Sequence, residues 1–442
     1  MLRATKQKAD CLRELRPLVR NINVTGGSLT LGVASVYNKG DDRMEQIDKK
    51  HNKRGLLYIC PVIGALAIGG ICIFALPQQT YSAQENRYLT VRPQISVDGI
   101  FSGEVQQGLT EASNDQFPGR DLWMQTATTS QYLLYHREIN GVYIGKDGYL
   151  FDKIVDGDLS EQNYRKNIGF ITALRQNADT DVSVMLVPTP GTVLTDELPT
   201  RAVLYDPASY EALGDELCEA DSVRWITIRE DLERAAHDSL QPLYFKTDHH
   251  WTTDGAYLGA SAYLQAHGIT PASQEDYGIE TKSDQFYGTL YSKVAGLPGE
   301  KPDELELPMN LPQGIRIETS GAPADALSAN GTHEMPVLDG IYDLSKLDVK
   351  DKYAVYFGGN YGSLTITNPE AHTDRKLLII KDSYANSMVP YLIGSYAQIT
   401  MIDLRYNNES VSELAAQGWD EILVCYEMSN FIKDKNLFKI LR

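Results

Sequence analysis

The stretch KLLIIKDSYANSMVPYLIG, Lys376–Gly394, decides the fold class of this 442-residue chain. It begins with a run of apolar residues, turns at Asp382 and Ser383, and continues into a segment that is typical of a helix. A short apolar run without polar alternation is typical of a parallel strand that is covered on both faces. The stretch therefore predicts a strand, a turn and a helix of an α/β protein, with Ser383 at the turn.

Strands and helices are expected to alternate over most of the chain after Asn163. Apolar runs predict strands at 182–188, 223–228, 353–357, 376–382, 398–404 and 421–426, and helical periodicity predicts helices at 162–176, 209–219, 254–267, 387–395 and 411–417. This order predicts a doubly wound α/β/α sandwich with a parallel sheet. Residues 268–350 break the alternation and are rich in Pro, Gly, Asp and Ser, so we interpret them as an insertion that either overhangs a site or forms surface loops.

Two shorter patterns precede this region. Apolar residues at helical intervals between 100 and 137 predict two helices that are joined at Pro118-Gly119. The segment VYIGKDGYLF, Val142–Phe151, has an Asp-Gly turn between aromatic runs and predicts a hairpin.

The segment Leu56–Leu76 contains no charged residue over about 20 positions, the length that crosses a bilayer as a helix. Basic residues lie just before it, so the positive-inside rule predicts that residues 1–55 are cytoplasmic and that the chain after Leu76 is outside. The chain is therefore expected to be a single-pass protein of the cell membrane. Residues 77–99 would form a stalk and residues 100–442 an extracellular domain.

Two points near the N-terminus have alternatives. Residues 1–43 are basic and lack clear periodicity, and Met44 offers another start of translation, so no function is assigned to them. The alternative to a membrane anchor is a signal peptide cleaved at Ser82-Ala83, but the length of the apolar run favours the anchor.

Composition limits the partners and cofactors. The formal net charge of −18 at pH 7 argues against nucleic acid as a partner, because a phosphate backbone would be repelled. The five cysteines show no metal-ligand or redox spacing, and only Cys218 and Cys425 follow the apolar segment. These two either pair or remain free thiols. No cofactor is predicted.

A second stretch contains the groups that a nucleophilic serine needs. FKTDHHWTTDGAY, Phe245–Tyr257, places an acid and two histidines beside a tryptophan, directly before a predicted helix. A nucleophilic serine needs a base within hydrogen-bond reach, and the base needs a carboxylate that fixes its tautomer. In an extended segment, residues two apart project to the same side, so His250 is predicted as the base and Asp248 as its orienting acid. His249 is expected to point away and to serve in packing or as a supporting donor.

Other interpretations of these residues stay open. Asp248, His249 and His250 are also metal-ligating residue types, but no further Cys or His cluster accompanies them, so no metal is predicted. The same cluster is compatible with a packed polar network. Ser383, at a strand-to-helix turn, is also a preferred helix cap.

KTDHHWTTDGAY resembles the signature of the DHHW protein family, which comprises bacterial, mostly Gram-positive, membrane-anchored proteins. Other blocks that resemble the family in the same order, from Ser82 to the C-terminus, are ENRYL, NDQFPGRD, GKDGYLF, FYGTLYSK, YFGGNYG, KDSYANSMVPYL and IDLRY. The family is similar to SGNH-like acetyltransferases that modify alginate and related cell-surface polysaccharides, which implies a circularly permuted SGNH-hydrolase fold. Carried over by motif, Asp248, His250 and Ser383 match the Ser-His-Asp triad of those enzymes.

The chain departs from the SGNH pattern at two points. Those enzymes usually carry Gly-Asp-Ser at the nucleophile, whereas position 381 is Lys here, which leaves the geometry of the turn open. Their oxyanion asparagine lies in a G-x-N-D block, and GGNYG supplies Gly359 and Asn360 as candidates without the following Asp. Trp251 and Arg405 are expected to line the substrate pocket or to pack at strand ends, and Tyr384 is expected to line the pocket.

The resemblance implies that Ser383 accepts an acyl group and passes it to an acceptor. We predict an SGNH-type serine acyltransferase that acetylates a cell-surface or cell-wall polysaccharide. Because acetyl-CoA is cytoplasmic, the resemblance implies a multi-pass membrane-bound O-acyltransferase as the acetyl donor. The acidic domain favours neutral or cationic glycans as acceptors. The alternatives are a surface carbohydrate O-acetylesterase, in which water is the acceptor, and a non-catalytic glycan-binding or assembly protein.

Overall fold

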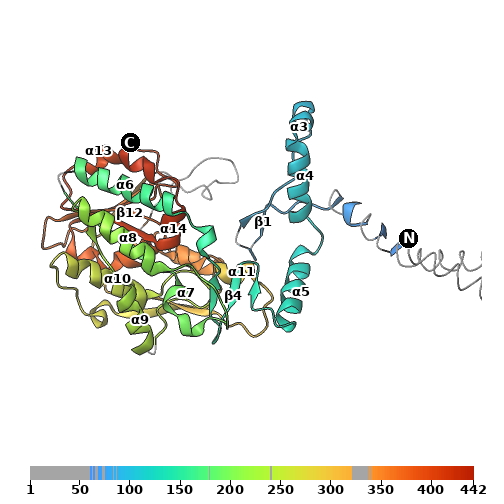
Figure 1. Ribbon diagram of the computed structural model, residues 1–442, viewed down its shortest axis with the longest axis horizontal. Coiled ribbons are helices and arrows are strands. Elements are labelled where there is room, and N and C mark those ends of the chain that lie inside the picture. Colours follow the sequence, from blue (N-terminus) through green and yellow to red (C-terminus); the bar gives the residue numbers. More distant parts are fainter. Residues whose placement is uncertain are drawn as a thin grey trace, which may run out of the picture. The chain divides into compact units, whose positions relative to one another are not determined.

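The computed structural model describes residues 60–442 except for 62, 65–67, 72–74, 83, 86, 179, 239–240, 321–337 and 339 (Figure 1). The chain divides into two units, Met1–Pro77 and Gln78–Arg442. The predicted cytoplasmic segment 1–55, and several residues of the predicted membrane segment 56–76, lie outside the described residues. Among the residues that are described, no helix combines the length and the apolar character that crossing a membrane requires.

A seven-stranded sheet organises the second unit, in the order β10-β11-β13-β12-β14-β6-β7. The strands are β6 (Asp181–Val187), β7 (Arg224–Trp225), β10 (Arg316–Ser320), β11 (Ser363–Thr367), β12 (Lys376–Lys381), β13 (Gln398–Ile402) and β14 (Glu421–Glu427). The neighbours β13, β12, β14, β6 and β7 pair in parallel. Strand β11 runs antiparallel to both β13 and β10, so one edge of the sheet is antiparallel and the fold is mixed α/β.

The helices and the small sheets complete this unit. The α-helices are α3 (Val97–Ser102), α4 (Glu104–Asp115), α5 (Arg120–Leu133), α6 (Glu161–Asn177), α7 (Pro190–Val193), α8 (Pro207–Ala220), α9 (Arg229–Asp238), α10 (Thr253–Ala266), α11 (Thr289–Lys293), α12 (Tyr384–Met388), α13 (Val411–Ala415) and α14 (Met428–Lys433). The 3-10 helices are η1 (Asp156–Asp158), η2 (Thr195–Glu197), η3 (Gln274–Tyr277), η5 (Leu344–Asp348), η6 (Lys352–Val355), η7 (Val389–Tyr391), η8 (Ile393–Ser395) and η9 (Leu437–Leu441). The small sheets pair β1 (Tyr81–Ser82) with β2 (Arg87–Tyr88), β4 (Val142–Ile144) with β3 (Glu138–Ile139) and β5 (Leu150–Asp152), and β8 (Ile279–Phe286) with β9 (Asp303–Pro308).

Helices cover both faces of the large sheet because the side chains of its central strands alternate between two apolar cores. In β12, Leu377 and Ile379 belong to one core, and Leu378 and Ile380 belong to the other. The first core includes buried residues of α10 and α12, and the second includes buried residues of α6 and α8. A strand that is apolar on both faces is thus covered on both faces, as its sequence predicts.

Most predicted elements are present at their predicted positions. The strands predicted at 182–188, 376–382, 398–404 and 421–426 are confirmed as β6, β12, β13 and β14, and the helices predicted at 162–176, 209–219, 254–267 and 411–417 are confirmed as α6, α8, α10 and α13. The predicted hairpin is formed by β4 and β5. The predicted helical break lies between α4 and α5, where Gly119 has a positive φ of 68°.

The strand predicted at 353–357 is wrong. Lys352–Val355 forms the 3-10 helix η6, and Phe357, Gly358 and Gly359 follow with positive φ angles of 61°, 73° and 131°, which turn the chain. The apolar side chains of this run are buried in the first core, so their hydrophobicity reflects packing and not sheet pairing. The strand that pairs with β13 on the side away from β12 is β11, whose sequence alternates polar and apolar residues.

Two further predicted elements are shorter than expected. The helix predicted at 387–395 is α-helical only to Met388 and then continues as η7 and η8, because Pro390 has no N–H to donate. The strand predicted at 223–228 is reduced to the two residues of β7, at the edge of the sheet, and helix α9 follows.

The insertion 268–350 reaches the predicted active-site loop. Its helix α11 begins there, where the backbone N–H of Thr289 donates to Asp248 (2.8 Å) and that of Tyr291 donates to the carbonyl of Thr247 (3.0 Å). These contacts place the start of α11 against the loop that carries Asp248. Residues 321–337 and 339 of it lie outside the described residues.

We expect Trp251→Ala to lower the free energy of unfolding by about 3–5 kcal/mol, because the indole is fully buried. Its Nε1–H also donates to the carbonyl of Tyr384 (3.0 Å) and to Ser387 Oγ (2.8 Å). Urea denaturation of the purified protein measures the loss. The matched control is Trp123→Ala, because Trp123 is 62% exposed, and its effect should stay within about 0.5 kcal/mol. Equal losses in the two variants would show that the buried indole of Trp251 stabilises the fold no more than an exposed one does.

Candidate active site

Ser383 stands at the turn between β12 and α12, where the buried carboxyl group of Asp382 fixes the backbone. Asp382 Oδ1 accepts from the backbone N–H of Tyr384 (3.0 Å). Its Oδ2 accepts from the N–H of Glu427 (3.0 Å) and from Asn430 Nδ2 (2.9 Å). These bonds tie the end of β12 to the end of β14. They hold the half-buried Ser383 at the carboxyl edge of the sheet, where open α/β sheets bind their ligands.

The loop that carries the acid and the histidines is not the extended segment predicted from the sequence. Residues 246–250 form consecutive bends. The bends arise because Asp248 Oδ1 accepts from both the backbone N–H and the Nδ1 of His250, at 3.0 and 2.6 Å. Downstream, Thr252 caps α10 by accepting from the N–H of Gly255. The predicted pairing of Asp248 with His250 is nevertheless present, although a folded loop produces it.

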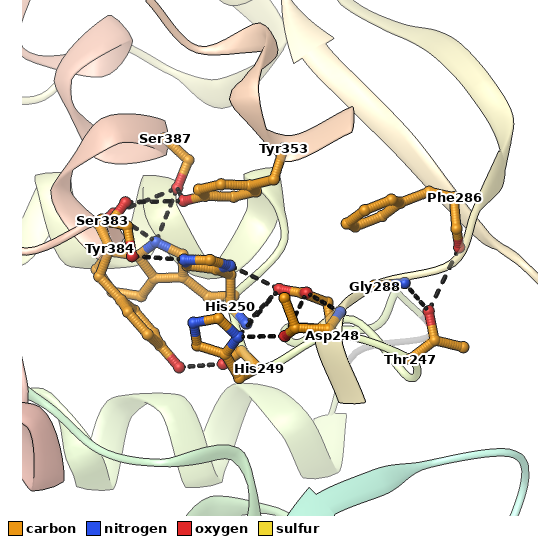
Figure 2. Close-up of polar contacts among 12 residues, drawn as sticks. Thr247, Asp248, His249, His250, Phe286, Gly288, Tyr353, Ser383, Tyr384 and Ser387 are labelled. Atoms are coloured by element: carbon orange, nitrogen blue, oxygen red, sulfur yellow. Dashed lines mark hydrogen bonds and ion pairs between the residues drawn. The ribbon is translucent and has the colours of Figure 1, made fainter. Parts of the chain in front are cut away.

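The structure brings Asp248, His250 and Ser383 into one hydrogen-bonded chain (Figure 2). His250 Nε2 lies 2.8 Å from Ser383 Oγ, across 133 residues of sequence. An ionised carboxylate only accepts, so His250 Nδ1 carries the proton that Asp248 accepts, and Nε2 is left to accept the hydroxyl proton of Ser383. This is the geometry of a nucleophile, a base and an orienting acid.

The aromatic side chain of Tyr353 holds the imidazole of His250 in place. The ring of Tyr353 stacks on His250 with centroids 3.7 Å apart and planes inclined by 8°. The Tyr353 hydroxyl donates to the carbonyl of Ser383 (3.2 Å) and to Ser387 Oγ (2.9 Å), as Figure 2 shows. Tyr353 thereby fixes the plane of the base and the backbone of the candidate nucleophile together.

Burial sets the ionisation of the two partners. Burial lowers the pKa of His250 to about 4; the nearby His249 acts in the same direction, and Asp248 opposes it. Burial by itself would raise the pKa of Asp248, but the charges of His249 and His250 and the hydrogen bonds from His250 and Thr289 hold that pKa well below its usual range. At neutral pH the site therefore contains a carboxylate and a neutral imidazole, the states that general-base catalysis requires.

His249 lies against the base and does not point away as predicted. Its ring centroid is 3.9 Å from that of His250, and its Nδ1 lies 2.7 Å from Thr289 Oγ1. Asp248, His249 and His250 offer ligand atoms within 4.8 Å of one another, which is the metal alternative. Both ring nitrogens of His250 already have hydrogen-bond partners.

A cavity of about 340 Å³ is lined by His249 and Tyr384, the sequence neighbours of His250 and Ser383. It lies within the size range of small-ligand sites. Its polar lining includes Lys293, Lys433 and Glu427. Burial raises the pKa of Glu427 to about 7, so this carboxyl group is only partly ionised at neutral pH.

The three other residues predicted for the pocket, Trp251, Tyr384 and Arg405, each lie in a different environment. Trp251 is fully buried and packs beneath α12, so it is a packing residue. Tyr384 lines the 340 Å³ cavity, and its hydroxyl donates to the carbonyl of His249. Arg405 forms a two-pronged ion pair with the buried Asp403, at 2.9 and 2.6 Å.

The candidates for an oxyanion site are joined to the strand that leads to Ser383. Asn360 Oδ1 accepts from Lys381 Nζ (2.7 Å) and from Asn386 Nδ2 (3.1 Å). The preceding Gly359 has a positive φ of 131°, a conformation that glycine adopts at little cost.

Sequence reasoning gave no role to Tyr353, Gly288 or Thr289. The block FYGTLYSK, which contains Gly288 and Thr289, was recognised in the family resemblance and was the signal that could have identified the last two. Tyr353 belongs to the run 353–357, whose apolar pattern predicts a strand, so the local sequence gives no signal of its role.

Comparisons with known proteins agree with this architecture. The family model described as DHHW protein matches residues 228–402, and the model described as SGNH hydrolase-like domain, acetyltransferase AlgX, matches residues 142–302. The predicted resemblance to the DHHW family and to SGNH-like acetyltransferases is thereby confirmed. No curated protein matches the sequence.

Solved structures show the same fold at low sequence identity. A DHHW family protein from Eubacterium siraeum is 20% identical, with a TM-score of 0.54, over 69% of this chain and 95% of that chain. PatB1 from Bacillus cereus, solved with a sulfonyl adduct, is 21% identical, with a TM-score of 0.51, over 68% of this chain and 100% of that chain. These likenesses show that the chain shares its mixed α/β fold with both proteins.

We expect Gly288→Ala to reduce ester turnover at least 10-fold, because a Cβ at this position would lie 2.2 Å from the Cβ of Asp248 and 2.4 Å from its Oδ2. The carboxylate would have to move away from His250, and small displacements in a catalytic site cost about 10²-fold. Hydrolysis of p-nitrophenyl acetate measures the effect. Gly394→Ala is the matched control, since apart from its chain neighbours no described residue has an atom within 4 Å of the added Cβ, and it should retain the parental rate. A parental rate in Gly288→Ala would show that the position of Asp248 does not limit turnover.

The lowered pKa of His250 predicts the acidic limb of the pH profile. The base acts in its neutral form, which persists until the pH falls through its pKa, so kcat/KM should hold at pH 6 and fall only near pH 4. Steady-state hydrolysis of the same ester between pH 3.5 and 8 measures this limb, with circular dichroism at each pH to confirm folding. A midpoint at or above the ordinary value of about 6.5 would show that Asp248 outweighs burial.

Proposed function

We propose that this protein is an O-acetyltransferase that modifies a cell-surface or cell-wall polysaccharide through Ser383, His250 and Asp248. The observation that carries the proposal is the unbroken chain from Ser383 Oγ to His250 Nε2 (2.8 Å) and from His250 Nδ1 to Asp248 (2.6 Å). The match of residues 142–302 to an SGNH-like acetyltransferase domain supports acetyl transfer as the reaction class.

The geometry is suited to two successive displacements on an acetyl group. In the first, Ser383 Oγ attacks the carbonyl carbon of the acetyl donor, and His250 Nε2 takes the hydroxyl proton. Asp248 stabilises the imidazolium that forms. The tetrahedral intermediate then expels the donor's leaving group, which receives the proton from His250, and the acetyl group remains on Ser383 as an ester.

The second displacement returns the enzyme to its starting state. A sugar hydroxyl of the acceptor attacks the acetyl ester while His250 takes its proton. The intermediate expels Ser383 Oγ, which regains the proton from His250, and the product is the O-acetylated glycan. Water in place of the sugar would release acetate instead, so the acceptor separates a transferase from an esterase.

The membrane segment and the donor belong to the same proposal. The uncharged segment Leu56–Leu76 would anchor the protein in the cell membrane with the domain after it outside. The acetyl group would then come from a multi-pass membrane-bound O-acyltransferase, and the anchor would raise the effective concentration of Ser383 near that partner. The net charge of −18 favours neutral or cationic glycans as acceptors.

Ser383→Ala should abolish acetyl transfer, with a loss of about 10⁴-fold or more, because the group that forms the acyl-enzyme is removed. The assay incubates the purified protein with p-nitrophenyl acetate and a neutral oligosaccharide, and follows O-acetyl product by mass spectrometry. Intact mass of the parental protein should show an acetyl adduct on Ser383. Ser395→Ala, which changes a half-buried serine in η8, is the matched control and should keep the parental rate.

The same experiment distinguishes the alternatives. Release of acetate that does not depend on the oligosaccharide would identify an esterase. Absence of an adduct, together with glycan binding that survives Ser383→Ala, would identify a non-catalytic glycan-binding protein. Full transfer by Ser383→Ala would refute the mechanism.

A further inference from the structure

Lys381 is a buried cation two residues before the candidate nucleophile, and the triad does not use it. It is the last residue of β12 and is 3% exposed. Its Nζ lies 2.7 Å from Asn360 Oδ1 and 2.8 Å from Asn386 Oδ1. Among the described residues, the nearest carboxylate is that of Asp403, which is 3.9 Å away and is held by Arg405. Its close partners are therefore two neutral amides, an unusual environment for a buried charge.

An ammonium group fixes the orientation of an amide that it contacts. A lysine ammonium carries three donors and no acceptor, so the oxygen of each contacting amide must face it. Asn360 Oδ1 also accepts from Asn386 Nδ2 (3.1 Å), which gives that oxygen two donors. Both bonds require the same orientation of Asn360, in which its NH₂ group is turned away from Lys381.

The network also joins Asn360 to the turn that carries Ser383. Lys381 precedes Ser383 on β12, and Asn386 follows it on α12, where its backbone N–H donates to the carbonyl of Ser383 (3.1 Å). The half-buried Asn360 comes from the turn after η6, which contains Gly358 and Gly359. The side chain of Asn360 is thus hydrogen-bonded to one residue before Ser383 and to one residue after it in the sequence.

We propose that Lys381 is a positioning residue that orients the amide of Asn360 so that its N–H groups face the acyl carbonyl during transfer. The inference rests on the proposed function, since Asn360 would donate to the oxygen that becomes negative when Ser383 attacks. Lys381 would touch neither substrate nor reacting atoms. The lysine would replace the glycine that SGNH enzymes usually have at this position, which gives this departure from the family pattern a physical role.

The charge state supports this role. Burial lowers the pKa of Lys381 to about 8, while Asp403 opposes the shift and Arg405 acts with burial. The amine is therefore mostly protonated at neutral pH. A protonated amine can only donate, which is the property that fixes the amide.

The test is a double-mutant cycle on ester turnover. Asn360→Ala alone should lower kcat by about 10²–10³-fold, the loss typical of an oxyanion donor. Lys381→Met alone should lower kcat by about 10-fold or more with little change in KM. The reason is that Lys381 orients Asn360, whose contact with the acyl oxygen is made only in the transition state. In the Asn360→Ala background, Lys381→Met should cause no further loss, because Lys381 acts through that amide. Losses that multiply in the double variant would overturn the proposal.

A second variant separates positioning from a purely structural role. Asn360→Asp keeps an oxygen for Lys381 and gains an ion pair, but it has no N–H groups. It should therefore keep the parental melting temperature and lose about 10²-fold or more in kcat. A parental kcat in this variant would overturn the proposal. If Lys381→Met does not fold, the cycle is run with Lys381→Gln, whose amide still donates to Asn360 and should keep part of the rate.

Lys376→Met is the matched control, because it removes an exposed lysine from the other end of the same strand. It should keep the parental kcat. The outcomes also distinguish this inference from the proposed function. If Ser383→Ala abolishes turnover while Lys381→Met leaves kcat unchanged, the acyl-enzyme mechanism stands and the role of Lys381 is refuted.

Discussion

The buried carboxylate of Asp248 is the constraint on which the site depends. This group is 1% exposed, and an ionised carboxylate in such a position is stable only when donors surround it. His250 supplies two of them and Thr289 supplies two more. The Asp248 carboxylate therefore bends the loop, fixes the tautomer of the His250 imidazole and binds the start of α11 in the insertion. Gly288 permits the last contact because a side chain there would occupy the space of the carboxylate.

A second buried carboxylate performs the corresponding task on the sheet. Asp382 binds the backbone of its own turn and the N–H of Glu427, the last residue of β14, so the position of Ser383 follows from the pairing of two parallel strands. The hydroxyl and the imidazole thus belong to separate scaffolds, the sheet edge and the loop before α10. Tyr353 joins the scaffolds because its ring stacks on His250 and its hydroxyl contacts the backbone of Ser383. The site consequently requires the complete tertiary fold.

Position 381 shows how a departure from a family pattern can be compatible with the same fold. A lysine side chain at a strand end could have disrupted the turn, but here it extends into a polar cluster formed by Asn360, Asn386 and Asp403. Arg405, which the sequence places either in the pocket or at a strand end, pairs with Asp403 in the same cluster. The similar structures align with about two thirds of this chain and with nearly all of their own length.

The sequence alone determined the features that depend on neighbouring residues. The apolar run of β12 and the residues that follow it predicted both the strand and the place of Ser383, and the spacing of Asp248 and His250 predicted their pairing. Only the tertiary structure decided that residues 353–357 are not a strand, and that Tyr353, Thr289 and Lys381 surround the site. The physical reason is that these contacts join residues that are 20 to more than 100 positions apart. Packing and buried charge select them in three dimensions, and neither leaves a periodic pattern in the local sequence.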